Sequence, residues 1–73
     1  MTGAALEQAE LASEKLRRQL GESPALRGIG IAILDDGYGV KVNLLHESAR
    51  DLVPDDVDGV PVIVDIVGVI SAY

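Results

Sequence analysis

The feature that most constrains the fold is a pair of alternating segments on either side of Asp36-Gly37. An aspartate–glycine pair is typical of the two-residue type I′ turn that joins antiparallel strands. The pattern therefore predicts a β-hairpin over residues 27–45, with Asp36 and Gly37 at the centre of the turn. In that register the opposed pairs are Ile33–Val40, Ile31–Val42 and Ile29–Leu44. All six side chains share one bulky face, and the other face is small and partly polar, with Gly30, Ala32, Leu34, Gly39, Lys41 and Asn43.

The segment before the hairpin predicts an amphipathic helix over residues 4–20. Its inward face is spaced by three and four residues and comprises Leu6, Ala9, Ser13, Leu16 and Leu20. Acidic residues come early and basic residues late, an order that complements the helix dipole. Gly21 is expected to end the helix in a left-handed conformation, and Pro24 prevents its continuation.

Residues 46–59 form the connection between the hairpin and the last strand. Residues 46–53 are expected to make one or two helical turns, with Ser48 as the N-cap and with Leu52 and Val53 pointing inward. Pro54 ends these turns, and the acidic residues after it are typical of a loop.

Residues 60–67 predict a third strand, which is apolar on both faces except at Asp65. Pro61 cannot donate a backbone hydrogen bond, so it belongs at the strand start or on an edge. The strand is expected to continue through Val69 and Ile70 after a bulge at Gly68. The long connection favours parallel pairing beside the first strand of the hairpin, and antiparallel pairing beside the second is the alternative.

The element order αββ(α)β predicts a two-layer α+β fold, a single domain over residues 1–73 with one helix on a three-stranded sheet. The chain lacks cysteine, tryptophan and phenylalanine, so its core must be aliphatic. Leu6, Leu16 and Leu20 are expected to pack on the bulky hairpin face. Unless the connection folds over the other face, an apolar patch stays exposed there, and such patches mark interfaces. The predicted interface residues are Leu34, Ile63, Val67, Val69 and Ile70.

Charge and hydropathy exclude several classes of partner. The net charge of −6 argues against binding to nucleic acid or to anionic membranes. No apolar stretch reaches the ~20 residues of a membrane span, and no secretory signal begins the chain, so a cytoplasmic protein is expected. The apolar C-terminal end predicts either a last strand tied into the sheet or a chain that continues in a longer protein.

No catalytic, metal-binding or cofactor-binding motif is complete. A glycine-rich dinucleotide pattern beginning at Gly28 fails because Ile33 replaces its third glycine and a hairpin follows. A calcium-loop pattern around Gly59 fails because Pro54 replaces its first aspartate. A metalloprotease-like string at His46 has Arg50 where the second histidine would stand. The sequence therefore predicts no enzyme activity, metal or cofactor. The remaining site hypothesis is a small anion site formed by Arg27, Lys41 and Arg50.

The strand-rich part also resembles a known protein module. The resemblance rests on four segments: Gly28-Ile29-Gly30-Ile31-Ala32, Gly37-Tyr38-Gly39-Val40-Lys41-Val42, Leu52-Val53-Pro54, and Val57-Asp58-Gly59-Val60-Pro61-Val62 with Gly68. Together, over residues 27–70, they resemble the small module found at the N-terminal side of many bacterial trypsin-like serine proteases. This resemblance implies a noncatalytic, propeptide-like or accessory α+β module and implies no catalytic residue for this chain.

The expected function is thus protein interaction through an exposed sheet face or edge. The partner would be a second copy of the chain or another protein, such as a serine protease domain. The alternative is a small-ligand or anion-binding protein that uses the three basic residues.

Overall fold

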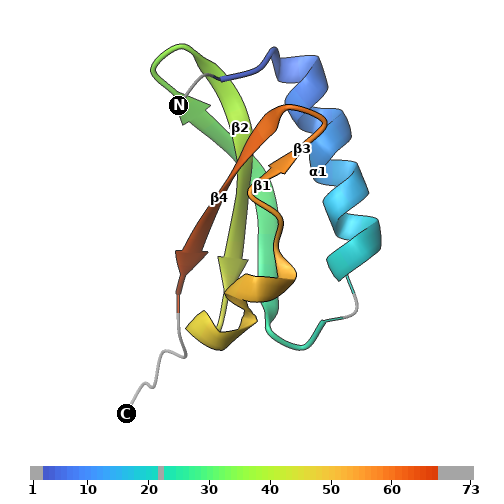
Figure 1. Ribbon diagram of the computed structural model, residues 1–73, viewed down its shortest axis with the longest axis vertical. Helices are drawn as coiled ribbons and strands as arrows, with labels where there is room; N and C mark the ends of the chain where they lie inside the picture. Colours follow the sequence, from blue (N-terminus) through green and yellow to red (C-terminus); the bar gives the residue numbers. More distant parts are fainter. Residues whose placement is uncertain (1–2, 22, 68–73) are drawn as a thin grey trace.

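The computed structural model describes residues 3–21 and 23–67. It is a small α+β fold in which one helix packs on a four-stranded mixed sheet (Figure 1). The elements along the chain are α1 (Leu6–Leu20), β1 (Leu26–Leu34), β2 (Gly37–Leu44), the 3₁₀ helix η1 (Glu47–Leu52), β3 (Asp56–Val57) and β4 (Val60–Ile66). The strand order in the sheet is β1-β2-β4-β3.

The last long strand, β4, lies beside β2 and runs parallel to it, as Figure 1 shows. Both pairings expected for this strand are therefore wrong, because β4 takes the neighbour of one and the direction of the other. The expected count of three strands is also wrong. Asp56 and Val57 leave the connection to pair with β4, and they form the short fourth strand β3.

The hairpin register differs from the expected one by two residues. Ile31 pairs with Val40 and Ile29 with Val42, so Asp35 and Asp36 are the central turn residues. Neither has the positive φ that a type I′ turn requires, and the positive φ of +151° falls on Gly37. A shift of two residues keeps every side chain on its expected face.

The N-terminal residues explain why glycine is needed just after the turn. The backbone of Ala4 exchanges two hydrogen bonds with Tyr38, of 2.7 and 2.8 Å. The N–H of Gly3 donates to Asp36 Oδ1 at 2.9 Å. A Cβ on Gly37 would lie 2.8 Å from the carbonyl oxygen of Ala4, so a side chain there would displace this segment.

Helix α1 contains no β-branched residue, which favours helix formation, and it carries Glu7 in its first turn and Arg17 and Arg18 in its last. Its buried residues are Ala9, Ala12, Ser13, Leu16 and Leu20. Leu6, expected to be buried, is 42% exposed. Gly21 ends the helix in a right-handed conformation rather than the expected left-handed one, and its N–H bonds to the Arg17 carbonyl.

The core lies between α1 and the face of the sheet that carries Val40, Val42 and Leu44, here called the helix face. These three side chains of β2 are buried as expected. On β1, however, Ile31 is 36% exposed and Ile33 is 85% exposed. The difference arises because β1 is an edge strand, whereas β2 has strands on both sides.

The connection also packs on the helix face. Ala49 and Val53 join the core cluster, whereas Leu52, expected to point inward, is exposed. The turns form a 3₁₀ helix with His46 as the N-cap residue, so Ser48 lies inside it and is not the cap. Within the described residues, no helix is long and apolar enough to cross a membrane.

Candidate functional site: the edges and faces of the sheet

The backbone of β1 presents polar groups to solvent along one side. Because Tyr38 uses its N–H and C=O to bind Ala4, it has none left for Ile33, its partner on β1. Peptide groups alternate in direction along an antiparallel strand. It follows that Ile29, Ile31 and Ile33 all direct their N–H and C=O groups away from β2. We call this side of β1 the outer edge.

A side chain from the helix gives independent evidence for this direction. Arg17 Nη2 donates a hydrogen bond of 3.0 Å to the carbonyl oxygen of Ile29. That oxygen must therefore point out of the hairpin. Over residues 3–21 and 23–67, this is the only hydrogen bond made by the outward groups of Ile29, Ile31 and Ile33.

The side chains along the outer edge are apolar in the middle and charged at the ends. Ile33 is the most exposed large apolar residue of the described chain, and Ile31 is also exposed. Arg27 lies at a bulge near the start of β1, and Asp35 follows its last residue. Both charged residues are exposed. A long apolar edge of this kind is a template for the addition of another strand.

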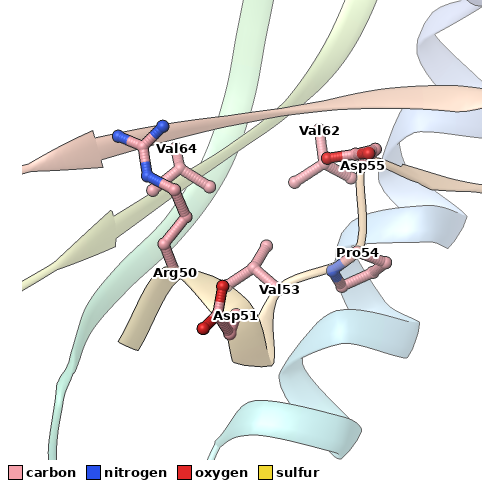
Figure 2. Close-up of a pocket in the computed structure, with 7 residues that line it drawn as sticks. All are labelled: Arg50, Asp51, Val53, Pro54, Asp55, Val62 and Val64. Carbon is pink, nitrogen blue, oxygen red and sulfur yellow. The ribbon is translucent and has the colours of Figure 1, made fainter. Parts of the chain in front are cut away.

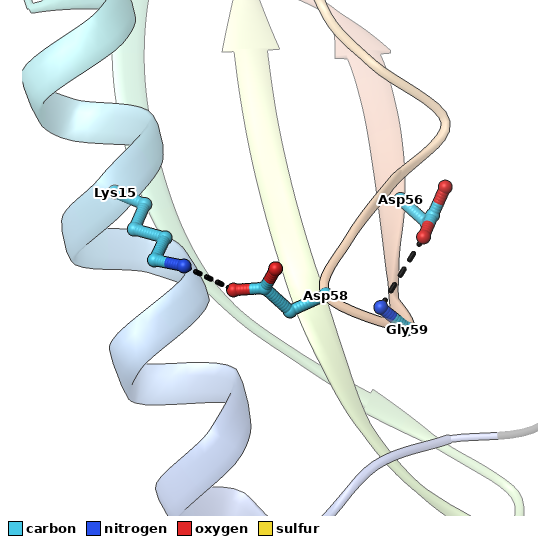
Figure 3. A network of polar contacts seen from close by, with 4 residues as sticks. All are labelled: Lys15, Asp56, Asp58 and Gly59. Atoms are coloured by element: carbon cyan, nitrogen blue, oxygen red, sulfur yellow. Dashed lines mark hydrogen bonds and ion pairs between the residues drawn. The ribbon is translucent and has the colours of Figure 1, made fainter.

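The opposite edge of the sheet begins with a short strand and carries charged residues. It begins with β3, which has two residues and joins β4 through the turn at Asp58 and Gly59. β3 and the carbonyl of Asp55 cover β4 only as far as Val62, so within the described residues the rest of β4 has a strand on one side only. Asp58 forms an ion pair with Lys15 of α1, and Asp56 Oδ2 accepts a 3.2 Å hydrogen bond from the N–H of Gly59 (Figure 3). Short edge strands with charged residues are poor templates for strand addition.

The face of the sheet opposite the helix face carries Gly39, Lys41 and Ile63, and we call it the open face. The connection, which was one candidate to cover it, lies on the helix face instead. In the described part of the chain no other element lies over the open face. A Cβ built on Gly30 would meet no atom within 4 Å.

The open face is nevertheless partly closed by its own side chains. A Cβ on Gly39 would lie 3.3 Å from Leu34 Cδ1 and 3.3 Å from Pro61 Cγ, so these two side chains flank the space above the glycine. Lys41 and Asp65 form an ion pair of 3.6 Å across neighbouring strands. The result is a face of small residues and one ion pair.

The predicted interface residues are spread over these surfaces. Leu34 and Ile63 lie on the open face and are half-buried. Val67 follows the end of β4 and is 42% exposed. Val69 and Ile70 lie outside the described residues.

The three residues of the predicted anion site do not come together. Lys41 lies on the open face, paired with Asp65, and Arg27 lies at the bulge in β1. Arg50 lines an open depression of about 400 Å³ on the helix face, shown in Figure 2. The other residues lining it are Asp51, Val53, Pro54, Asp55, Val62 and Val64. With two carboxylates beside one guanidinium, the depression carries no net positive charge.

Sequence reasoning expected an exposed sheet face or edge, but it did not identify β1 as that edge or the role of Arg17 beside it. The exposed isoleucines were assigned to the core because they alternate like core residues. Only the position of β1 at the border of the sheet separates them from Val40 and Val42, and the pattern of a strand does not report that position. In the described residues no group of three or more histidine or acidic side chains comes together as metal ligands would.

Comparisons with protein-family models, curated proteins and solved structures find no match for this chain. The resemblance to the protease-associated module therefore stays a prediction.

Proposed function

We propose that this protein is a noncatalytic interaction module that binds another polypeptide strand along its outer edge. The observation that carries the proposal is the outward direction of the peptide groups of Ile29, Ile31 and Ile33 in a nine-residue edge strand. These groups offer main-chain hydrogen bonds, and the exposed isoleucines offer apolar contact. Strand addition uses both kinds of interaction.

The outer edge is a better candidate than the open face, where the interface was first expected. On the open face Leu34 and Ile63 are already half-buried, and Lys41 is paired with Asp65. At the outer edge Ile33 has most of its surface in water. Burying Ile33 would gain about 25 cal/mol for each Å² of apolar area removed from water.

The partner classes that we propose are a second copy of the chain and, from the resemblance, a trypsin-like serine protease domain. In the second case the module would act as an accessory or propeptide-like element. Both partners would have to supply an extended strand to β1.

The test compares variants of two exposed apolar residues. Backbone amide chemical shifts are followed while the protein is concentrated or a protease domain is added. Ile33→Lys places a charge on the outer edge, and Leu52→Lys places the same charge on η1, away from it. We expect shifts centred on residues 29–33 when the protein is concentrated or mixed with a protease domain. Ile33→Lys should remove these shifts, and Leu52→Lys should leave them. Shifts centred on Lys41 and Ile63 would assign the interaction to the open face and contradict the proposal.

Anion binding at Arg50 is the second candidate function. Its support is that Arg50 lines the depression of Figure 2 and forms no ion pair within the described residues. Its weakness is the presence of Asp51 and Asp55 in the same lining. Inorganic phosphate should shift the amides around Arg50 in the wild type and not in Arg50→Gln. Absence of wild-type shifts at millimolar phosphate would remove this candidate.

A further inference from the structure

We propose that the strand which binds the outer edge is β1 of a second copy, antiparallel to the first, with Ile31 on the two-fold axis. This inference rests on the proposed function and names the strand that binds the outer edge. Two identical strands that pair antiparallel are related by a two-fold axis, which closes the assembly at a dimer. The two sheets would then form one continuous sheet across the interface.

The direction of the peptide groups fits this register. With Ile31 on the axis, Ile31 faces its own copy, and Ile29 of each chain faces Ile33 of the other. All three residues point their N–H and C=O groups outward, so each opposed pair can exchange two hydrogen bonds. The exposed isoleucine side chains of the two copies then meet on the same face of the joined sheet.

Charge selects this register over its neighbours. Arg27 and Asp35 lie four residues before and four residues after Ile31. With Ile31 on the axis, Arg27 at the bulge of each β1 therefore comes near Asp35, which follows the other β1. A shift by one pair in one direction would place Arg27 opposite Ile33, and the reverse shift would place Asp35 opposite Ile29. Both shifted registers set a charge against an isoleucine.

In the monomer one outward group of the edge already has a hydrogen-bond partner. Arg17 donates to the Ile29 carbonyl, the group that would accept the N–H of Ile33 from the second copy. Pairing therefore exchanges one exposed hydrogen bond for a ladder of them. The bond to Arg17 does not shield the peptide groups of Ile31 and Ile33, so most of the edge stays free for pairing.

The experiment is a charge-swap cycle measured by sedimentation equilibrium from micromolar to millimolar protein. Arg27→Glu and Asp35→Arg alone should each weaken the dimer about tenfold, because the two-fold axis makes each change act twice. The double variant should return to the wild-type dissociation constant. Both residues are exposed, so the fold should persist, which circular dichroism would verify.

Net charge separates this effect from general repulsion. Arg27→Glu makes the chain more negative, Asp35→Arg makes it less negative, and the double variant keeps the net charge of −6. If only repulsion between acidic chains mattered, Asp35→Arg would tighten the dimer. Arg50→Glu is the matched control, since it changes the net charge as Arg27→Glu does but lies on η1. We expect it to change the dissociation constant less than Arg27→Glu does.

The outcomes distinguish this inference from the proposed function. A dimer that the double variant fails to restore overturns the register. A monomer at millimolar concentration overturns the self-pairing, and the proposed function survives if a protease domain still shifts the amides of residues 29–33. If Ile63→Lys breaks the dimer and Ile33→Lys does not, both the self-pairing and the proposed function are overturned.

Discussion

The two edges of this sheet are built in opposite ways. The β3 edge has two residues, an ion pair to the helix and a turn closed by a carboxylate. The β1 edge has nine residues, exposed isoleucines and one hydrogen bond from Arg17. The first has features that proteins use to prevent edge-to-edge pairing, and the second lacks most of them. The contrast indicates that the outer edge is the more favourable of the two for the addition of a strand.

The largest loss of stability should come from weakening the packing of α1 on the sheet, because this packing supports both edges. Leu16 is fully buried between α1 and the sheet, and Leu11, on the same helix, is 62% exposed. Leu16→Ala should cost about 2–5 kcal/mol of unfolding free energy. A domain of 73 residues has only about 4–11 kcal/mol in total, so much of the fold would be lost.

Leu11→Ala is the matched control, because it makes the same chemical change at an exposed position. Urea denaturation of both variants should separate them by more than about 1 kcal/mol. Equal losses would mean that α1 does not pack through Leu16 as described.

An intermediate effect should come from the turn that holds the short edge. Gly59 has a φ of +84° and open space around a Cβ, so Gly59→Ala should cost about 1–2 kcal/mol through backbone strain alone. In a domain of this size each kcal/mol lowers the Tm by about 4–8 °C.

Gly30 provides the comparison for Gly59, since a Cβ there also meets no atom within 4 Å and its φ is not positive. Gly30→Ala should raise stability by about 0.5–1 kcal/mol, because glycine is unfavourable within a strand. Opposite signs of the two Tm shifts are the expected result. A loss at Gly30 comparable to that at Gly59 would indicate that something packs over the open face.

The smallest effect should come from the ion pair at the short edge. The Lys15 and Asp58 side chains are 55% and 67% exposed, so Lys15→Met should cost no more than about 1 kcal/mol. The loss should shrink as sodium chloride screens the pair. A loss that does not depend on salt would show that the lysine stem, rather than its charge, supports β3.

The sequence predicted the helix, the hairpin strands and the faces of most of their residues, because these follow from local periodicity. Leu6, which was expected on the buried face of the helix, is an exception. It misplaced the tight turn of the first hairpin. The chain has two Asp-Gly pairs, and positive φ at both residues occurs at Asp58-Gly59 rather than at Asp36-Gly37. The N-terminal segment that binds beside Asp36 and Tyr38 gives Gly37 its role, and a contact between residues 33 positions apart leaves no local pattern.

Local sequence patterns say even less about the strand order and the candidate site, because both depend on contacts between distant segments. Which strand lies at a border is decided by the path of the connection over the helix face. That path requires Ala49 and Val53 to reach the core and two residues of an acidic loop to pair with β4. Neither requirement can be inferred from alternation, so the partly buried Ile29 could not be distinguished from the exposed Ile31 and Ile33.

The difference between the two edges also decides how far assembly could go. In the terms of polymer chemistry, a unit with two reactive ends propagates a chain, and a unit with one reactive end terminates it. The outer edge is the long apolar end for strand pairing, whereas the other end consists of the two-residue β3 and the part of β4 beyond Val62, which carries the charged Asp65. Joining two outer edges consumes the apolar end of each copy, and growth into a fibre would have to proceed through the charged β4 edge, where Asp65 is already paired with Lys41.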